Sequence, residues 1–144
     1  MHRLRSVIQR QQLICAAPAT TVFDVAVTMT AGGVGAIPIL DGDELVGVFS
    51  ERDLMGRVIV PGRDPRTTAV GEVMTRDVVT ASLEDHVDFC LEKMQRAGCR
   101  HLPIVAGGRV ISMISMRDLL RDELQEQDEE IQHLKAYLHQ SPPS

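Results

Sequence analysis

The 144-residue sequence lacks the cysteine pattern of a disulfide or metal framework. Its three cysteines, Cys15, Cys90 and Cys99, are odd in number, show no C-x-x-C spacing and fall within apolar patterns. Cysteines of this kind usually behave as small apolar side chains in a reducing compartment. We therefore expect all three to pack in the core.

The sequence also lacks an excess of positive charge and a long apolar run. Its net charge is -5, whereas binding to nucleic acid or to an anionic membrane depends on clustered positive charge. The longest uncharged run, residues 25–40, is interrupted by glycines and Pro38 and is too short to span a bilayer. Polar residues 9–12 interrupt any apolar signal segment. We expect a soluble, cytoplasmic protein without a nucleic-acid or membrane partner.

No catalytic motif is present in the sequence. It contains no Gly-x-Ser-x-Gly, no P-loop, no His-Glu-x-x-His, and no cysteine and histidine at a shared spacing. A nucleophile, a base and an orienting group therefore cannot be assigned. We expect the protein not to be an enzyme.

What the sequence does contain is an internal repeat. The segment Ser50-Glu51-Arg52-Asp53-Leu54 returns 65 positions later as Ser115-Met116-Arg117-Asp118-Leu119. A repeat at a fixed spacing indicates one supersecondary unit that is used twice. The same shift, without a gap, also pairs Val22 with Val87, Met29 with Met94, Gly33 with Gly98, and Pro38 with Pro103.

Each copy predicts a short strand, a helix, a hairpin and a second helix. Residues 22–29 and 87–94 place apolar side chains on one helical face, and glycines follow. Asp41-Gly42, a dipeptide typical of tight hairpins, separates two apolar segments. The sequence therefore predicts an α/β (α+β) fold of two β-α-β-β-α repeats. The expected units are residues 1–66 with a lead-in helix, 67–122, and an acidic helical tail over 123–144.

The tail carries apolar residues at heptad spacing, with Gln127 in the one polar position. This pattern predicts a terminal helix that either pairs with another copy of the chain or lies on the body. The segment Ser141-Pro142-Pro143 should end it. The apolar positions are Leu120, Leu124, Ile131, Leu134 and Leu138.

The repeated Ser-x-x-Asp motif has two interpretations. A serine before a helix with an acidic residue three positions later forms a capping box without any ligand. However, a helix start offers free N–H groups and a positive dipole end to an anion, and Arg52 or Arg117 can add charge-assisted donors to a phosphate. The aspartate can accept from two neighbouring hydroxyls, as on a ribose. The second interpretation predicts a nucleotide site.

The order of helix, glycine, apolar-Pro-apolar strand, turn and Ser-x-x-Asp-Leu, used twice, resembles the CBS-domain family over nearly all of residues 5–122. The form is a single tandem pair, or Bateman module. This resemblance implies two repeats packed through their sheets about a pseudo-two-fold axis, two clefts, and usually a homodimer. It also implies a regulatory module that binds AMP, ADP, ATP, NAD(H) or S-adenosylmethionine and signals to an unknown effector protein, with AMP as the first expectation. The alternative is a ligand-free dimerisation scaffold.

The resemblance also assigns site residues. Asp53 and Asp118 would hold the ribose hydroxyls, and Ser50 and Ser115 the ribose or the first phosphate. Backbone and apolar side chains would enclose the adenine. The first cleft would comprise Ile14, Cys15, Ala36, Ile37, Pro38, Val48, Phe49, Ser50, Arg52 and Asp53, and the second Val79, Thr80, Arg100, His101, Leu102, Pro103, Met113, Ile114, Ser115, Arg117 and Asp118.

The two implied clefts differ in their charged residues. The shift partners of Arg100 and His101 are Gly35 and Ala36, which offer no charge. We therefore expect Arg100, His101 and Arg117 to meet most of a ligand's phosphate charge, with the first cleft secondary. For His101 a packed, hydrogen-bonded side chain is an equally good interpretation.

Two further differences concern the approach to each cleft. Cys15 stands in the first copy where Thr80 stands in the second, which weakens the first cleft. Ser112 replaces Gly47, and this exchange predicts a narrower approach to the base in the second cleft.

Overall fold

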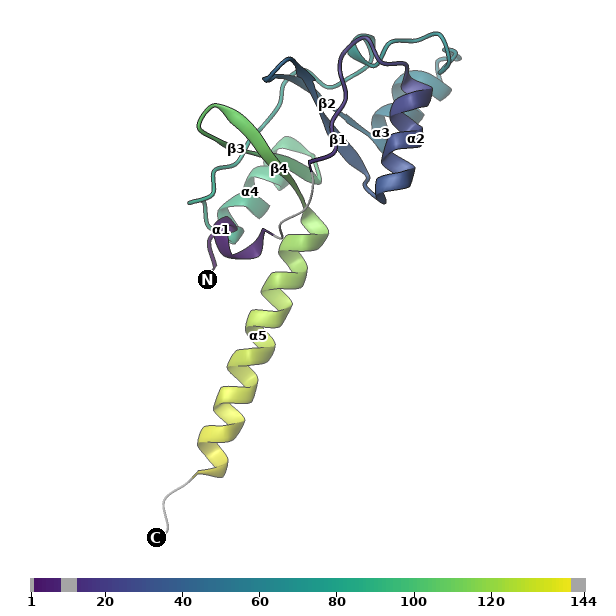
Figure 1. The fold of residues 1–144 in the computed structure, drawn as a ribbon. Coiled ribbons are helices and arrows are strands. Elements are labelled where there is room, and N and C mark those ends of the chain that lie inside the picture. Colours follow the sequence, from purple (N-terminus) through teal and green to yellow (C-terminus); the bar gives the residue numbers. More distant parts are fainter. Residues whose placement is uncertain (1, 9–12, 141–144) are drawn as a thin grey trace.

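The computed structural model describes residues 2–8 and 13–140, so the lead-in segment 9–12 and the predicted stop at Ser141-Pro142-Pro143 lie outside the described residues. Two similar units and a long terminal helix follow one another along the chain (Figure 1). The first unit contains α1 (Leu4–Val7), α2 (Val22–Gly32), β1 (Ala36–Asp41), β2 (Glu44–Ser50), α3 (Glu51–Asp53) and the π-helix η1 (Leu54–Ile59). The second contains the 3₁₀ helix η2 (Val70–Glu72), α4 (Val87–Ala97), β3 (His101–Ala106), β4 (Arg109–Ser115) and α5 (Met116–His139).

Each unit is built on one antiparallel hairpin. β1 pairs with β2 and β3 with β4, in registers that correspond position by position, such as Ile37 with Phe49 and Leu102 with Ile114. The predicted leading strand is shorter than expected, because one parallel bridge represents it in each unit. β4 contacts both β1 and β2, so the two hairpins face each other. The predicted repeat and mixed helix-and-strand fold are confirmed.

The repeat helices begin and end where the sequence predicts. The Thr21 hydroxyl accepts a hydrogen bond from the Asp24 amide at 3.2 Å and caps α2. Gly33 follows α2 with φ of 65°, and Gly98 follows α4 with φ of 67°. This left-handed conformation costs glycine little because glycine has no Cβ.

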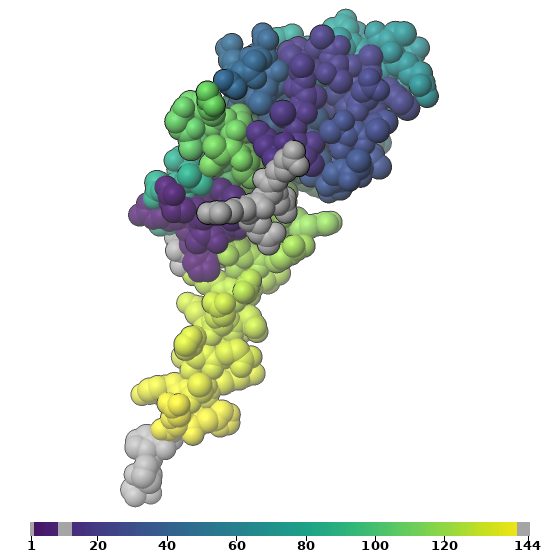
Figure 2. Space-filling model, viewed as in Figure 1, coloured from purple at the N-terminus to yellow at the C-terminus, as the bar shows by residue number. Residues whose placement is uncertain are grey.

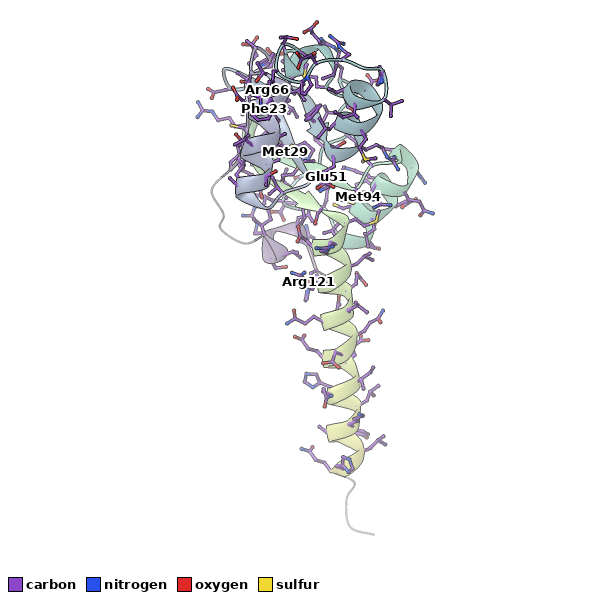
Figure 3. The ribbon with its side chains drawn as sticks, turned by 90° about the vertical axis from the view of Figure 1, so that its right-hand side faces the viewer. Phe23, Met29, Glu51, Arg66, Met94 and Arg121 are labelled. Atoms are coloured by element: carbon purple, nitrogen blue, oxygen red, sulfur yellow. The ribbon has the colours of Figure 1, made fainter. Side chains whose placement is uncertain are left out.

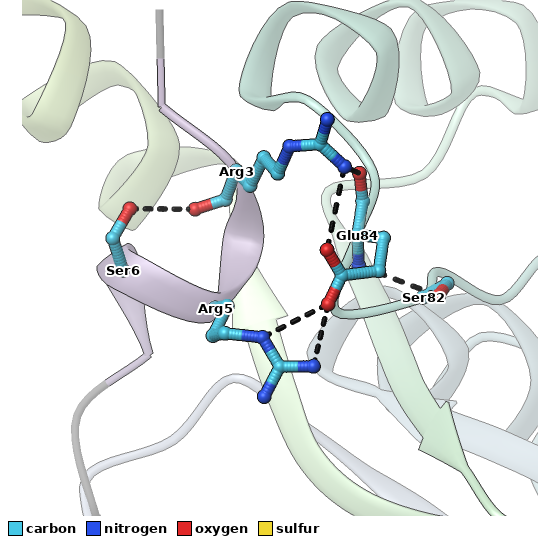
Figure 4. Close-up of polar contacts among 5 residues, drawn as sticks. All are labelled: Arg3, Arg5, Ser6, Ser82 and Glu84. Atoms are coloured by element: carbon cyan, nitrogen blue, oxygen red, sulfur yellow. Dashed lines mark hydrogen bonds and ion pairs between the residues drawn. The ribbon is translucent and has the colours of Figure 1, made fainter.

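The segments that precede the two repeats are exchanged between the cores. Leu4 of α1 is fully buried in the core of the second repeat, and its amide donates to the Asp85 carbonyl at 2.9 Å. Arg3 and Arg5 both pair with Glu84, which fixes α1 against the second unit (Figure 4). Conversely, Val70, Val73 and Met74 pack in the core of the first repeat. Each half therefore contributes side chains to the core of the other.

The cysteine prediction is confirmed at two positions and wrong at one. Cys90 is buried, and burial raises the pKa of its thiol to about 11. Cys99 is partly buried and packs against the second core. Cys15 is exposed, because Ile14 and Ala16 pack on the first core and successive side chains of an extended segment face opposite sides.

Helix α5 leaves the body partway along its length (Figures 1 and 2). Leu119 is fully buried at its start, whereas every described residue from Gln127 to Gln140 is exposed. The lower part of the tail thus does not lie on the body of its own chain. In the described part of the chain, no helix is both long and apolar enough to span a bilayer.

Candidate ligand-binding site

Both Ser-x-x-Asp motifs form complete capping boxes. In the first, the Asp53 amide donates to Ser50 Oγ at 3.2 Å and the Ser50 amide donates to Asp53 Oδ2 at 3.0 Å. In the second, both equivalent bonds, between Ser115 and Asp118, are 3.1 Å long. A carboxylate can accept several hydrogen bonds, so the box leaves room for a further donor. The surroundings of each aspartate determine whether another group of the chain already donates to the carboxylate.

The carboxylate of Asp53 already contacts other groups of the same chain. Asp53 is 7% exposed, and Thr75 Oγ1 donates to its Oδ1 at 3.1 Å. Arg57 Nε lies 3.5 Å from the same oxygen, while Ser50 Oγ is 3.1 Å from the other. A ribose could reach Asp53 only by displacing these groups.

A close backbone approach holds Thr75 in place. The amides and carbonyls of Val48 and Thr75 exchange two hydrogen bonds of 2.9 Å. Gly47 permits this approach, because a Cβ at that position would lie 2.4 Å from Met74 Sδ and 2.9 Å from the Thr75 carbonyl oxygen. The segment that leads into the second repeat therefore covers Gly47 and Val48 of the first repeat.

The apolar residues predicted for the first cleft belong largely to the core. Ile37 and Phe49 are 1% and 0% exposed, so their side chains stabilise the first repeat. Arg52, predicted to bind phosphate, donates instead to the Gly98 carbonyl of the other repeat at 3.3 Å. This contact places a positive charge at the C-terminal end of α4, where the helix dipole favours it. The remaining predicted residues divide between buried and more accessible positions, with Ala36 and Pro38 buried, Ile14 and Val48 half-buried, and Cys15 exposed.

The second repeat contains a cavity of about 370 Å³, within the usual range of small-ligand pockets. Asp118 lines it and is exposed. Among residues 2–8 and 13–140, Asp118 has no hydrogen-bond partner outside its capping box. The other lining residues come from the lead-in, from β4 and from α5: Ser6, Val7, Ile8, Ser112, Met113, Ile114, Arg121, Asp122 and Gln125.

The structure brings together only part of the predicted second site. Asp118, Met113 and Ile114 line the cavity, so Met113 does not belong to the core in the way that Met29 and Met94 do. Ser112 lines the cavity without closing it. The other predicted residues do not line it. Ser115 caps α5 beside Asp118, and Arg100 and Arg117 are exposed. Leu102 and Pro103 are buried in β3, Val79 packs on the second core, and the Thr80 carbonyl accepts from Lys93 Nζ at 2.9 Å.

Sequence reasoning missed two groups of cavity residues. Arg121, Asp122 and Gln125 follow Asp118 at intervals of three, four and seven, so helical periodicity places them on its face. That signal was present in the sequence. The contribution of Ser6 to Ile8 depends on the exchange of the lead-in segments, for which no local pattern exists.

His101 lies where the two repeats meet. A Cβ at Gly35 of the first repeat would be 3.4 Å from His101 Cε1 and Nε2, and 3.4 Å from Glu51 Oε1. Burial lowers the pKa of His101 below its usual value of 6.5, as does Arg100, while Glu51 and Asp118 oppose the shift. His101 is therefore a packed, predominantly neutral side chain between the repeats near neutral pH.

Comparison with known proteins agrees with this architecture. The family model described as CBS domain matches residues 4–59 and again 70–124. The chain belongs to the CBS-domain family. The CBS domain-containing protein CBSX3, mitochondrial, of Arabidopsis thaliana is 34% identical over 123 residues, which cover 82% of this chain and 60% of that protein. The chain thus spans about three fifths of the curated relatives that it first matches.

Solved CBS pairs share the fold. The pair of protein MJ0100, in complex with 5'-methylthioadenosine and S-adenosyl-L-methionine, superposes with a TM-score of 0.79 at 21% identity, covering 87% of this chain and 98% of that one. The CBS domain protein PAE2072 from Pyrobaculum aerophilum, complexed with AMP, gives a TM-score of 0.74 at 23% identity, covering 81% and 89%. The repeat is therefore that of a tandem CBS pair.

Proposed function

We propose that this CBS pair is a regulatory module that binds one adenosine ligand in the cavity of the second repeat. The observation that supports this most is the state of Asp118, an exposed carboxylate on a cavity of about 370 Å³ with acceptor capacity left beyond its capping box. Asp118 accepts hydrogen bonds from the ribose hydroxyls. The adenine packs against Met113 and Ile114 of β4 and against Val7 and Ile8 of the lead-in.

The ligand class follows from the chemistry of the cavity and its surroundings. Arg121 lies on the cavity wall, and Ser115, Arg117, Arg100 and His101 flank the start of α5, where the helix dipole favours an anion. AMP is the first candidate, followed by ADP and ATP, NAD(H) and S-adenosylmethionine. The adenosine compounds bound by the MJ0100 pair and by PAE2072 support this class.

Signalling follows from the elements that share the cavity. Its walls come from the segment that leads into the first repeat and from β4 and α5 of the second. A ligand that contacts all three favours one arrangement of the two halves, which is the requirement for coupling to another site. The effector is an unidentified protein, and the module works in the cytoplasm without catalysing a reaction.

The proposed assembly is a homodimer. Large apolar side chains are exposed on η1 and just after it, where Met55, Ile59 and Val60 are 66%, 57% and 80% accessible. Exposed apolar residues grouped on one element are typical of protein interfaces. These residues provide a body-to-body contact between two copies.

Isothermal titration of the full chain with AMP, ATP, NADH and S-adenosylmethionine tests the ligand site. Asp118→Ala should weaken binding of the preferred ligand at least about tenfold, because a charge-assisted contact is lost. Asp53→Asn, a conservative change at the equivalent position of the first repeat, should leave the affinity unchanged, whereas Asp118→Asn should weaken binding. Flat heats with all four compounds, on protein shown by mass spectrometry to carry no co-purified ligand, would leave the ligand-free scaffold as the function.

A further inference from the structure

The tail of α5 presents an apolar seam to solvent. Leu124, Leu134 and Leu138 are 68%, 63% and 68% exposed, and Leu120 and Ile131 are 47% and 49% exposed. Figure 3 shows side chains projecting from both edges of the helix below Arg121. We define the seam as these five residues and Gln127, which completes the spacing.

The seam has the period of a two-stranded coiled coil. Its six positions are separated alternately by four and three residues, which keeps them on one side of a slightly underwound helix. The stretch from Leu120 to Leu138 covers 19 residues, or about 28 Å of helix. Helices in proteins gain most of their stability by packing an apolar face, so this length of exposed seam calls for a partner helix.

We propose that α5 forms a parallel two-stranded coiled coil with α5 of a second copy of the chain. A two-fold axis parallel to the helices places each seam residue beside the same residue of the other copy. Both copies therefore use the same surface in the contact. The inference depends on the homodimer of the proposed function but not on the ligand.

Charge favours the parallel orientation. The positions flanking the seam include Glu123, Asp128, Glu130 and Lys135. In a parallel pair, Glu130 of each helix faces Lys135 of the other, which gives two attractive contacts. Glu123 of each helix faces Asp128 of the other, and these two contacts are repulsive. In the antiparallel register that keeps all six seam layers, Glu130 faces Glu130, Asp128 faces Asp128 and Arg121 faces Lys135. All of those flanking contacts are repulsive.

Gln127 favours the same orientation. In the parallel pair, the two Gln127 side chains share one layer, and their amides can hydrogen-bond to each other. In the antiparallel register, each Gln127 would face Ile131, which cannot pair with an amide. A polar side chain within an apolar seam is a known means of fixing register and partner number.

The upper end of the seam continues onto the body. Leu120 and Leu124 line a groove between α4 and α5, together with Leu91 and Gln95 of α4. Parallel helices place both bodies at the same end of the coiled coil, so the grooves of the two copies meet there.

Cysteine cross-linking tests the orientation. Leu134→Cys, in a Cys15→Ser background that removes the exposed native thiol, should give an interchain disulfide under mild oxidation, located at residue 134 by mass spectrometry. Ala136→Cys, on the opposite face of the same helical turn, is the matched control and should cross-link at least about tenfold more slowly, because the coiled coil holds these thiols apart.

Two outcomes of this experiment would contradict the proposal. Equal cross-linking of the Leu134→Cys and Ala136→Cys proteins would show that the seam does not pair with itself. A disulfide that forms only in a mixture of Leu124→Cys and Leu134→Cys chains would show an antiparallel pair.

A charge exchange tests the specific contact. Glu130→Lys and Lys135→Glu should each weaken the ligand-free dimer about tenfold in sedimentation equilibrium, since two attractive contacts become repulsive. The double variant restores both contacts and should bind within about twofold of the unchanged chain. Failure of the double variant to recover would exclude the parallel pairing of Glu130 with Lys135. Because no ligand is added, this result does not depend on the adenosine site.

Discussion

The two repeats carry the same Ser-x-x-Asp motif, but the surroundings of its aspartate differ between them. Around Asp53, Thr75 and Arg57 contact the carboxylate and bury it, whereas Asp118 is exposed on a cavity. Both aspartates complete a capping box. The motif therefore ends a strand and starts a helix in either case, and among residues 2–8 and 13–140 only Asp53 is also covered by a threonine from the segment that leads into the other repeat.

Of the variants that test this difference, those that remove an aspartate should change stability most. Asp53→Ala should lower the free energy of unfolding by about 3 kcal/mol, because it removes a buried carboxylate that accepts from Thr75 and from its own capping box. Asp118→Ala removes one exposed contact at a helix start and should cost about 1 kcal/mol. Urea unfolding of the ligand-free proteins measures both values. Equal losses would mean that the two carboxylates have equivalent surroundings after all.

Filling the space at Gly47 should have the next largest effect. In Gly47→Ala the new methyl group collides with Met74 and with the Thr75 carbonyl, so the packed segment must move away from β2. Such overpacking costs roughly 1–3 kcal/mol. Ser112→Ala, the same position in the open repeat, should change stability by less than about 0.5 kcal/mol. Thermal unfolding of the pair checks this, and comparable losses would contradict the close approach.

The sequence predicts those features of the fold that depend on residues close together along the chain. The Thr21 cap, the left-handed glycines and the two hairpins all follow from local patterns. The packing of Leu4 on the second repeat and of Met74 over Gly47 joins segments distant in sequence. The contact of Thr75 with Asp53 depends on this packing, so the difference between the two aspartates could be expected from residue types, whereas its physical cause could not.

A smaller effect is expected from the pH response of His101. Its pKa lies below the usual 6.5 because the side chain is buried, with Arg100 adding to the shift and Glu51 and Asp118 opposing it. The unfolded chain therefore binds more protons near pH 6 than the folded one. Stability attributable to His101 is present above pH 6.5 and is lost as the pH falls toward the lowered pKa. His101→Gln should flatten this slope in urea midpoints measured from pH 7.5 to 5.5, whereas the exposed His133→Gln should not.

The smallest effect on stability is expected from the titration of His2, and it depends on pH in the opposite direction to that of His101. Nδ1–H of His2 donates to the Asp122 carboxylate at 2.9 Å, and this bond raises the pKa of the imidazole above 6.5. Stability from this pair is present below pH 6.5 and is lost as the pH rises through the raised pKa. The His2 side chain is 41% exposed, so the change is small and should shrink further in high salt. His2→Gln should therefore remove a slight loss of stability between pH 6.5 and 8, and an unchanged slope would show that the His2 contact does not persist in solution.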